Sequence, residues 1–279
     1  MNSKLKIGGC VVLYNPDVNV LDNISTYIDI VEELIVVDNS SRKAIFLECL
    51  KEMPKVKYVF MNGNKGIASA LDKGIRILRD DGFDVVLTMD QDSKFPYEEG
   101  GNILAIVNEN FENYGILGLN FNAFVDNKTN KVIDVKTLIT SGNFVKLSDY
   151  LDVNGFNTEL FIDYVDFDFN NRLLVSGKKI GLIQDYSLIH KIGNPIEINL
   201  FGKTFYAMNH SPIRYYYRYR NSLYLYFRDK KFYRKLFLKE IFVNIPKMLL
   251  YEPNKLEKLK MIIRGVRDGI NGRLGSYSK

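Results

Sequence analysis

Several features that mark common protein classes are scarce or missing in this chain of 279 residues. It has only two cysteines, Cys10 and Cys49, which can build neither a disulfide framework nor a cysteine-based zinc site. It has no uninterrupted apolar run of about 18 residues, so we expect no membrane span. The short apolar run in MNSKLKIGGCVVLYNP does not resemble a cleavable signal peptide. We therefore expect a cytoplasmic protein.

Two glycine-rich phosphate-binding loops are also missing. The first predicted strand is followed by Tyr14-Asn15-Pro16-Asp17 instead of Gly-x-Gly-x-x-Gly, and Gly-x-x-x-x-Gly-Lys-Ser/Thr does not occur. These absences argue against the dinucleotide-binding fold and the P-loop ATPases. The formal net charge of +5 is too small to indicate nucleic-acid binding by itself. We expect no nucleic-acid partner.

The first third of the chain alternates between strand and helix patterns. Apolar, β-branched runs occupy residues 6–14, 32–41, 56–66 and 83–93. Helical spacing of apolar residues fills the stretches between them, at 15–31, 42–53 and 67–82. This alternation predicts βαβ units and a mainly parallel sheet flanked by helices.

The rest of the chain is less regular. Strands of mixed direction are indicated within 114–125 and 131–146, and a further strand ends at His190. Long helices rich in Arg, Lys and aromatic residues follow from Ser211. We predict one α/β domain over residues 1–225 and a basic, amphipathic helical region over 226–279.

The stretch LTMDQDSK places two carboxylates, Asp90 and Asp92, at the end of the fourth predicted strand. A solvated turn would explain them, because Asp favours turns. The alternative is a cation between two like charges. Mg²⁺ commonly binds one or two carboxylates together with substrate phosphates, and parallel sheets bind ligands beyond the carboxyl ends of their strands. The position favours Mg²⁺ or Mn²⁺ on these two residues, holding a diphosphate.

Polar residues follow the other three predicted strands at the same edge of the sheet. Asp38 is either a helix cap or an acceptor for the imide N–H of a pyrimidine base. The remaining candidates for contact with a nucleotide are Tyr14, Asn15, Pro16, Asn39, Asn64, Lys65, Gly66 and Gln91.

An acidic run, Asp163-Tyr-Val-Asp166-Phe-Asp168, precedes a predicted helix. Acids at a helix N-terminus also stabilise the helix dipole, which is the simpler explanation. Asp168 and Arg172 are four residues apart, so we expect them to pair. Asp166 then remains between two apolar neighbours, as suits a general base.

Three basic features allow more than one interpretation. His190, one of two histidines, is either structural or a metal ligand. The run RYYYRYR is either aromatic core with solvated charges or a phosphate clamp, with Arg220 as the candidate for donor binding. RNA binding is a third interpretation, for which a basic-aromatic run without a recognised module is weak evidence. The helices from Lys230 to Lys247 either rest on anionic lipid at the inner membrane face or pack against a second subunit in a homodimer.

Taken in order, these motifs resemble a known family. They are VVLYNP, VVDNSS, NKGIASALDKGI, LTMDQDS, SGNFVK, GFNTELFIDYVDFDFNNRLLVSGKKI, LIHKIG, SPIRYYYRYRN and GVRDGINGRLG. The chain is similar over nearly its whole length to the inverting glycosyltransferases of family 2, which have the GT-A fold, and most of all to their bacterial rhamnosyltransferase branch.

The resemblance implies a role for each candidate. Asp92 matches the direct metal ligand, and Asp90 lies nearer the ribose or the metal. Asp166 matches the catalytic base. It follows Val165 where the wider family has Glu, which leaves Asp163 as a competing candidate. The other implied roles are pyrimidine binding for Asp38, acceptor binding for Ser141, Gly142 and Asp163, and metal or diphosphate binding for His190.

The resemblance also implies a reaction. The expected donor is dTDP-L-rhamnose, bound by residues 1–95, and the expected acceptor is a saccharide or lipid-linked saccharide, bound by residues 96–225. The expected process is bacterial surface polysaccharide synthesis. Two other classes remain open, a nucleotidyltransferase and a non-catalytic nucleotide-sugar-binding scaffold.

Overall fold

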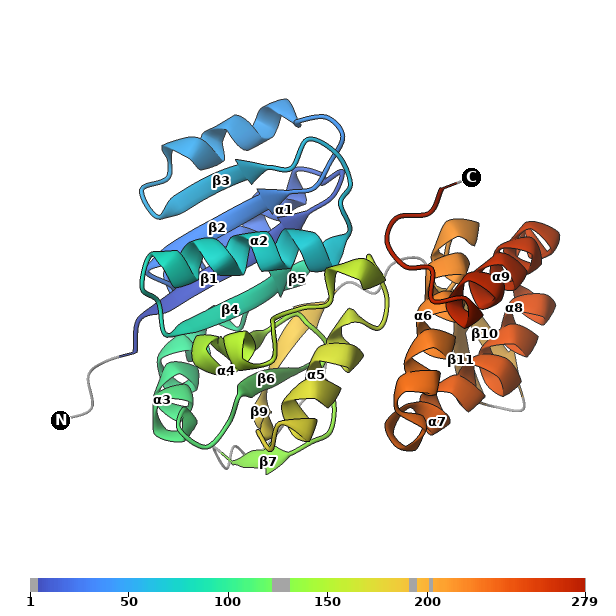
Figure 1. The fold of residues 1–279 in the computed structure, drawn as a ribbon. Coiled ribbons are helices and arrows are strands. Elements are labelled where there is room, and N and C mark those ends of the chain that lie inside the picture. The colour runs from blue at the N-terminus through green and yellow to red at the C-terminus, as the bar shows by residue number, and fades with distance from the viewer. Residues whose placement is uncertain (1–4, 122–130, 191–194, 201–202, 279) are drawn as a thin grey trace. The chain divides into compact units, whose positions relative to one another are not determined.

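The computed structural model describes residues 5–121, 131–190, 195–200 and 203–278 (Figure 1). The chain forms two compact units. The first contains residues 1–158 and 166–191, and the second contains residues 159–165 and 192–279. No helix within the described ranges is long and apolar enough to cross a membrane.

The first unit is built on a mixed sheet with the order β3-β2-β1-β4-β8-β6-β9, and β5 and β7 pair with β9. The strands are β1 (Ile7–Leu13), β2 (Glu33–Asp38), β3 (Val56–Phe60), β4 (Val85–Asp90), β5 (Ser93–Lys94), β6 (Ile116–Phe121), β7 (Val132–Asp134), β8 (Asn143–Lys146) and β9 (Ile180–His190). Strands β1 to β4 run parallel, and β8 runs antiparallel to both β4 and β6. The predicted α/β fold with a mainly parallel, mixed sheet is confirmed.

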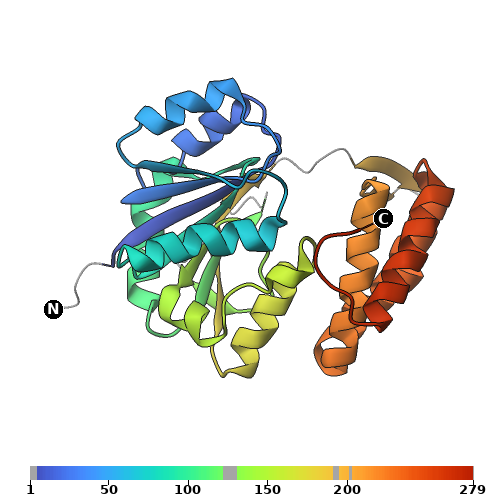
Figure 2. The same cartoon turned by 45° about the horizontal axis from the view of Figure 1, so that its top comes forward.

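Helices cover both faces of this sheet (Figures 1 and 2). They are α1 (Asn19–Ser25), η1 (Ile45–Glu52), α2 (Ile67–Asp80), η2 (Tyr97–Glu99), α3 (Gly100–Asn110), α4 (Leu147–Asp152), η3 (Thr158–Leu160) and α5 (Val165–Val175). Val11 and Leu13 of β1 face the core beneath α1 and α3, whereas a Cβ on Gly74 of α2 would meet Cys10. Alternate residues of β1 therefore serve opposite layers.

The second unit contains a two-stranded hairpin and a group of helices. Its elements are β10 (Ile196–Leu200), β11 (Lys203–Ala207), α6 (Pro212–Arg228), α7 (Lys230–Lys239), the π-helix η4 (Glu240–Asn244), α8 (Ile245–Tyr251) and α9 (Lys255–Ile270). A Cβ on Gly265 would lie 2.4 Å from the carbonyl oxygen of Tyr216, and one on Gly269 would lie 2.6 Å from that of Arg220. The two glycines of α9 thus allow close contact with α6.

This division differs from the boundary predicted after residue 225. Helix α6 belongs to the second unit with α9, together with the short segment 159–165 from the middle of the chain. The glycine contacts explain this grouping, because the backbone of α9 at Gly265 and Gly269 lies directly against the backbone of α6. Sequence pattern alone does not show such packing between distant segments.

Candidate functional site

The carboxyl ends of β1 and β4 are joined by Gln91. Its side-chain oxygen accepts a hydrogen bond of 2.8 Å from the backbone N–H of Tyr14, and its amide nitrogen donates to the Tyr14 carbonyl at 3.3 Å. Asn23 of α1 donates to the Gln91 carbonyl at 2.7 Å. Gln91, predicted to contact the donor, therefore holds the strand ends together. The ring of Tyr14 is half exposed beside Asn15 and Pro16.

The end of β2 is fixed in the same way. Asn15 donates from its backbone N–H to the hydroxyl of Ser40 at 2.8 Å, and the backbone N–H of Ser40 donates to a carboxylate oxygen of Asp38 at 3.0 Å. The hydroxyl of Tyr58 on β3 donates to the other oxygen. Asp38 is fully buried, so a pyrimidine could reach this carboxylate only if the residues around it moved.

The loop after β3 is attached to β2 through two asparagines. Asn39 accepts from the backbone N–H of Lys65 at 2.8 Å and donates to Asn64 at 3.1 Å. Asn64 also accepts from the N–H of Gly66, whose φ of +85° lets the chain enter α2. The predicted set Asn39, Asn64, Lys65 and Gly66 is thus brought together, with Asn64 and Lys65 exposed at the edge of the sheet.

The carboxylates at the end of β4 lie in a loop that is held by hydrogen bonds to Ser141. Asp90 is half-buried and Asp92 is exposed. The N–H of Asp90 donates to the hydroxyl of Ser141 at 3.0 Å, and that hydroxyl donates to Ser93 at 2.9 Å. Ser141 is fully buried, so its described contacts support the loop that carries the two aspartates. Gly142 next to it has a φ of +72° and faces Leu188.

Strand pairing places the backbone of His190 beside the loop that carries Asp90 and Asp92. It is the last residue of β9 and pairs with Ser93 of β5, directly after Asp92. Its side chain lies outside what the structure describes. Tertiary pairing therefore brings the two ends of this candidate site together across about a hundred residues of chain, from Asp92 to His190.

Asp90 and Asp92 fit a divalent cation by ligand type and by position. Hard cations take oxygen ligands, and an exposed loop at the carboxyl ends of parallel strands leaves room for a ligand beside them. Among the described residues, no group of three or more His, Cys, Asp and Glu side chains converges on one point. A cation here would need further oxygens, which a diphosphate provides.

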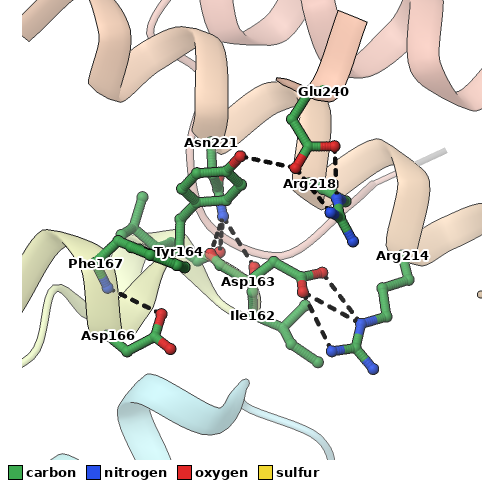
Figure 3. A network of polar contacts seen from close by, with 10 residues as sticks. Ile162, Asp163, Tyr164, Asp166, Phe167, Arg214, Arg218, Asn221 and Glu240 are labelled. Atoms are coloured by element: carbon green, nitrogen blue, oxygen red, sulfur yellow. Dashed lines mark hydrogen bonds and ion pairs between the residues drawn. The ribbon is translucent and has the colours of Figure 1, made fainter. Parts of the chain in front are cut away.

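Asp166 lies in the first turn of α5 and shares a small cavity with the sheet. The cavity is lined by Thr88 of β4, Asn143 of β8, Thr140 and Asn170, among others. Thr88 is two residues before Asp90, so the cavity begins at the strand that ends at this metal candidate. One oxygen of Asp166 accepts from the N–H of Phe167 at 2.9 Å (Figure 3).

Sequence reasoning did not identify the two asparagines of this cavity. Asn143 and Asn170 are buried, and each uses its amide nitrogen to bind a carbonyl of the 138–139 segment. Within the described part of the chain, their side-chain oxygens accept no hydrogen bond. They therefore suit a donor such as water or a sugar hydroxyl. The motif SGNF in the sequence gave the only signal for Asn143.

Asp163 has a different environment, inside the second unit. Its carboxylate pairs with Arg214 of α6 at 3.2 Å (Figure 3). Three residues of this segment have left-handed backbone: Phe161, Asp163 and Tyr164, with φ values of +62° to +67°. Such angles are costly for side chains other than Gly, so the segment depends on its surroundings.

Helix α6 supplies that support. The side-chain amide of Asn221 donates to the carbonyls of Leu160, Ile162 and Asp163, each at 2.9 Å. Tyr164 donates to Glu240 at 3.0 Å (Figure 3). The sequence gave little signal for these contacts, although Arg214, Arg218 and Asn221 share one face of α6 by their spacing.

Arg218 and Glu240 complete this network. Burial opposes the charge of Arg218, yet two hydrogen bonds of 2.7 and 2.8 Å to the Glu240 carboxylate hold its pKa above the ordinary value. Glu240 opens the π-helix η4, whose widened turn places it against α6.

Arg220 is not placed as its predicted role requires. It is fully buried, and its guanidinium donates to the carbonyls of Leu160, Glu159 and Gly275 and to Asn221. Burial lowers its pKa. Because backbone carbonyls of the second unit occupy these donors, Arg220 stabilises this unit in the structure and does not present a phosphate clamp.

The chain is similar to characterised proteins in sequence. Residues 10–141 match the family described as glycosyl transferase family 2. The dTDP-rhamnosyl transferase RfbF of Shigella flexneri is 29% identical over an alignment of 300 residues, which covers 99% of this chain and 98% of that protein.

Solved structures show the same fold. TarS of S. aureus, residues 1–349 in complex with UDP-GlcNAc, matches with a TM-score of 0.62 at 16% identity, over 96% of this chain and 81% of that fragment. GalNAc-T7 with UDP, GalNAc and Mn²⁺ matches with a TM-score of 0.62 at 11% identity, over 97% of this chain and 57% of its own. The fold is therefore GT-A. Residues 10–141 thus match glycosyl transferase family 2, and nearly the whole chain is similar to a dTDP-rhamnosyl transferase.

Proposed function

We propose that this protein is an inverting, metal-dependent glycosyltransferase that moves L-rhamnose from dTDP-L-rhamnose to a hydroxyl of a saccharide or lipid-linked saccharide. The process would be bacterial surface polysaccharide synthesis. The observation that carries the proposal is the placement of Asp90 and Asp92 at the carboxyl end of β4, with Asp166 at a small cavity that Thr88 of the same strand also lines. The donor sugar follows from the likeness to the rhamnosyl transferase of Shigella flexneri.

Asp90 and Asp92 would hold Mg²⁺ or Mn²⁺, with His190 at the neighbouring strand end. When bound, such a cation neutralises the charge that develops on a diphosphate leaving group. The presence of Mn²⁺ with UDP in the GalNAc-T7 structure supports this assignment. Exposed Tyr14, Asn64 and Lys65 would border the nucleotide.

Asp166 would act as the general base. It accepts the proton of the acceptor hydroxyl while that oxygen bonds to C1 of the sugar, opposite the diphosphate. The bond between C1 and the phosphate oxygen breaks in the same displacement, so the anomeric configuration inverts. Asn143 and Asn170 would accept hydrogen bonds from the acceptor beside this base. Asp163 is the weaker candidate because Arg214 already pairs with it.

The test compares Asp166→Asn, Asp163→Asn and Asp92→Asn with Asp80→Asn, an exposed control at the end of α2. With dTDP-L-rhamnose and a saccharide acceptor, Asp166→Asn should lower kcat by about 10²–10⁴-fold. Calorimetry should still detect dTDP binding by that variant in Mn²⁺. Asp92→Asn should lose the metal-dependent part of dTDP binding, and Asp80→Asn should match the wild type.

Four outcomes would contradict the proposal. Transfer that survives in Asp166→Asn but not in Asp163→Asn would move the base to Asp163. Activity in EDTA equal to that in Mn²⁺ would remove the metal. Retention of the anomeric configuration, measured by NMR of the product, would exclude a single displacement, and release of pyrophosphate would indicate a nucleotidyltransferase.

A further inference from the structure

The second unit exposes a basic surface along α7, η4 and α8, which follow one another in the chain (Figure 1). Six basic residues lie between positions 230 and 251: Lys230, Lys231, Arg234, Lys235, Lys239 and Lys247. The single acid in that stretch is Glu240, which is 4% exposed and paired with Arg218. The surface therefore carries positive charge that no acid of its own stretch offsets.

Large apolar side chains share this surface. Phe242 is 71% exposed and Leu250 is 67% exposed. Leu238, Val243 and Leu249 are exposed as well. Lys231, Lys235, Leu238 and Phe242 follow the spacing of one helical face. The basic side chains precede the apolar ones along that face.

The hairpin extends the apolar part. Phe205 of β11 is partly exposed, and Lys247 of α8 lies over its ring at 5.6 Å. We call the exposed residues of 230–251 together with Phe205 the α7–α8 face.

We propose that the α7–α8 face binds the surface of an anionic lipid bilayer. Phenylalanine and leucine enter the boundary between headgroups and acyl chains, while lysines and arginine approach lipid phosphates. Basic and apolar side chains on one exposed side of these helices match the two parts of the bilayer surface, the charged phosphates and the acyl chains beneath them. This proposal does not depend on the donor, the metal or the base proposed above.

The positive charge of the α7–α8 face argues against a second copy of the chain as its binding partner. A symmetric dimer would place the same patch opposite itself. Six cations would then face six cations without an exposed acid of this stretch between them, which is unfavourable. An anionic surface instead complements the charge.

Helix α9 provides a matched comparison within the same unit. Its exposed residues include Leu256 at 77% and Ile263 at 67%, comparable to Phe242 and Leu250. Its cations are more engaged, because Arg267 pairs with Asp268 at 3.3 Å and Arg264 donates to Tyr277. Both therefore expose large apolar side chains, whereas uncompensated charge is greater on the α7–α8 face.

The experiment is vesicle co-sedimentation of the full chain. Vesicles of phosphatidylcholine are compared with vesicles in which about a third of the lipid is phosphatidylglycerol. We expect binding at least about tenfold stronger to the anionic vesicles, and weaker in high salt. The charge variant Lys231→Glu with Lys235→Glu and the apolar variant Phe242→Ser with Leu250→Ser should each lose at least about tenfold in binding.

The control variant is Leu256→Ser with Ile263→Ser on α9, which should bind like the wild type. All substituted side chains are exposed, and circular dichroism checks that each variant is folded. Equal binding to both vesicle types, no binding, or equal loss in the α9 variant would overturn the proposal. So would a wild-type dimer, measured by light scattering, that dissociates in the Phe242→Ser, Leu250→Ser variant.

Discussion

The two cysteines differ in burial and therefore in the expected reactivity of their thiols. Cys10 lies in β1 with no exposed surface, and burial raises the pKa of its thiol to about 12. Cys49 is exposed within η1. A thiolate is the reactive form, so only a thiol that reaches water at moderate pH is alkylated.

We therefore expect native protein at pH 8 to incorporate one equivalent of iodoacetamide, at Cys49. Unfolding in urea should expose Cys10 and raise the incorporation to two equivalents, which peptide mass spectrometry can assign. The Cys49→Ser variant is the control, and it should remain unlabelled until it unfolds. Rapid labelling of Cys10 in native protein would contradict its buried position.

His210 makes the second unit sensitive to acid. Burial, with Arg214 nearby, lowers its pKa from 6.5 to about 4. The unfolded chain therefore binds the proton more readily than the folded one. The stability that a neutral His210 contributes is present above about pH 6.5 and is lost as the pH falls toward 4.

We expect the urea midpoint of unfolding to decline between pH 6.5 and pH 4, and to decline less steeply in His210→Gln. The variant removes the titrating group while keeping a polar side chain. An identical slope in both proteins would show that His210 does not contribute. Circular dichroism at several pH values gives the midpoints.

At the scale of elements, the close contact of α6 and α9 depends on the absence of a side chain. Gly265→Ala would place a methyl group 2.4 Å from the Tyr216 carbonyl oxygen, so one helix must move. We expect a loss of about 1–3 kcal/mol in the free energy of unfolding. Gly101→Ala in α3 meets nothing within 4 Å and should be neutral or stabilising by up to about 1 kcal/mol. Denaturant titration distinguishes the two.

The left-handed segment 161–164 leads directly into α5. Asn221 donates to the carbonyls of Ile162 and Asp163 and to that of Leu160, just before the segment. Asn221→Asp would place a carboxylate against these oxygens. If Asp166 is the base, three residues after Asp163, we expect kcat to fall by about 100-fold with KM little changed. Ser222→Ala on the same helix is the control. A change in KM alone would limit Asn221 to substrate binding.

At the scale of the whole molecule, two compact units predict two separate responses to ligands. Hydrogen exchange followed by mass spectrometry should show that dTDP with Mn²⁺ protects residues 38–40, 62–66 and 90–93. Anionic vesicles should instead protect peptides of 230–251. If either ligand alone protected both regions from exchange, the two units would be coupled, which would contradict this prediction.

Much of the fold was predictable because its signals are local. The β-branched runs of β1 to β4 and the periodicity of α2 appear in any short window of sequence. The pair between Asp168 and Arg172 was confirmed at 2.8 Å, since four residues on a helix span one turn. The expected helix at 42–53 forms as the shorter 3₁₀ helix η1, and that at 15–31 is helical only over α1.

The sequence by itself determined which residue types end each parallel strand, because strand periodicity and turn chemistry act between near neighbours. Only the tertiary structure decided what those residues contact. It buried Asp38 beneath Tyr58, set Ser141 under Asp90 and placed Arg220 among carbonyls of its own unit. These contacts join residues 20 to 61 positions apart, and their geometry depends on how packed elements meet.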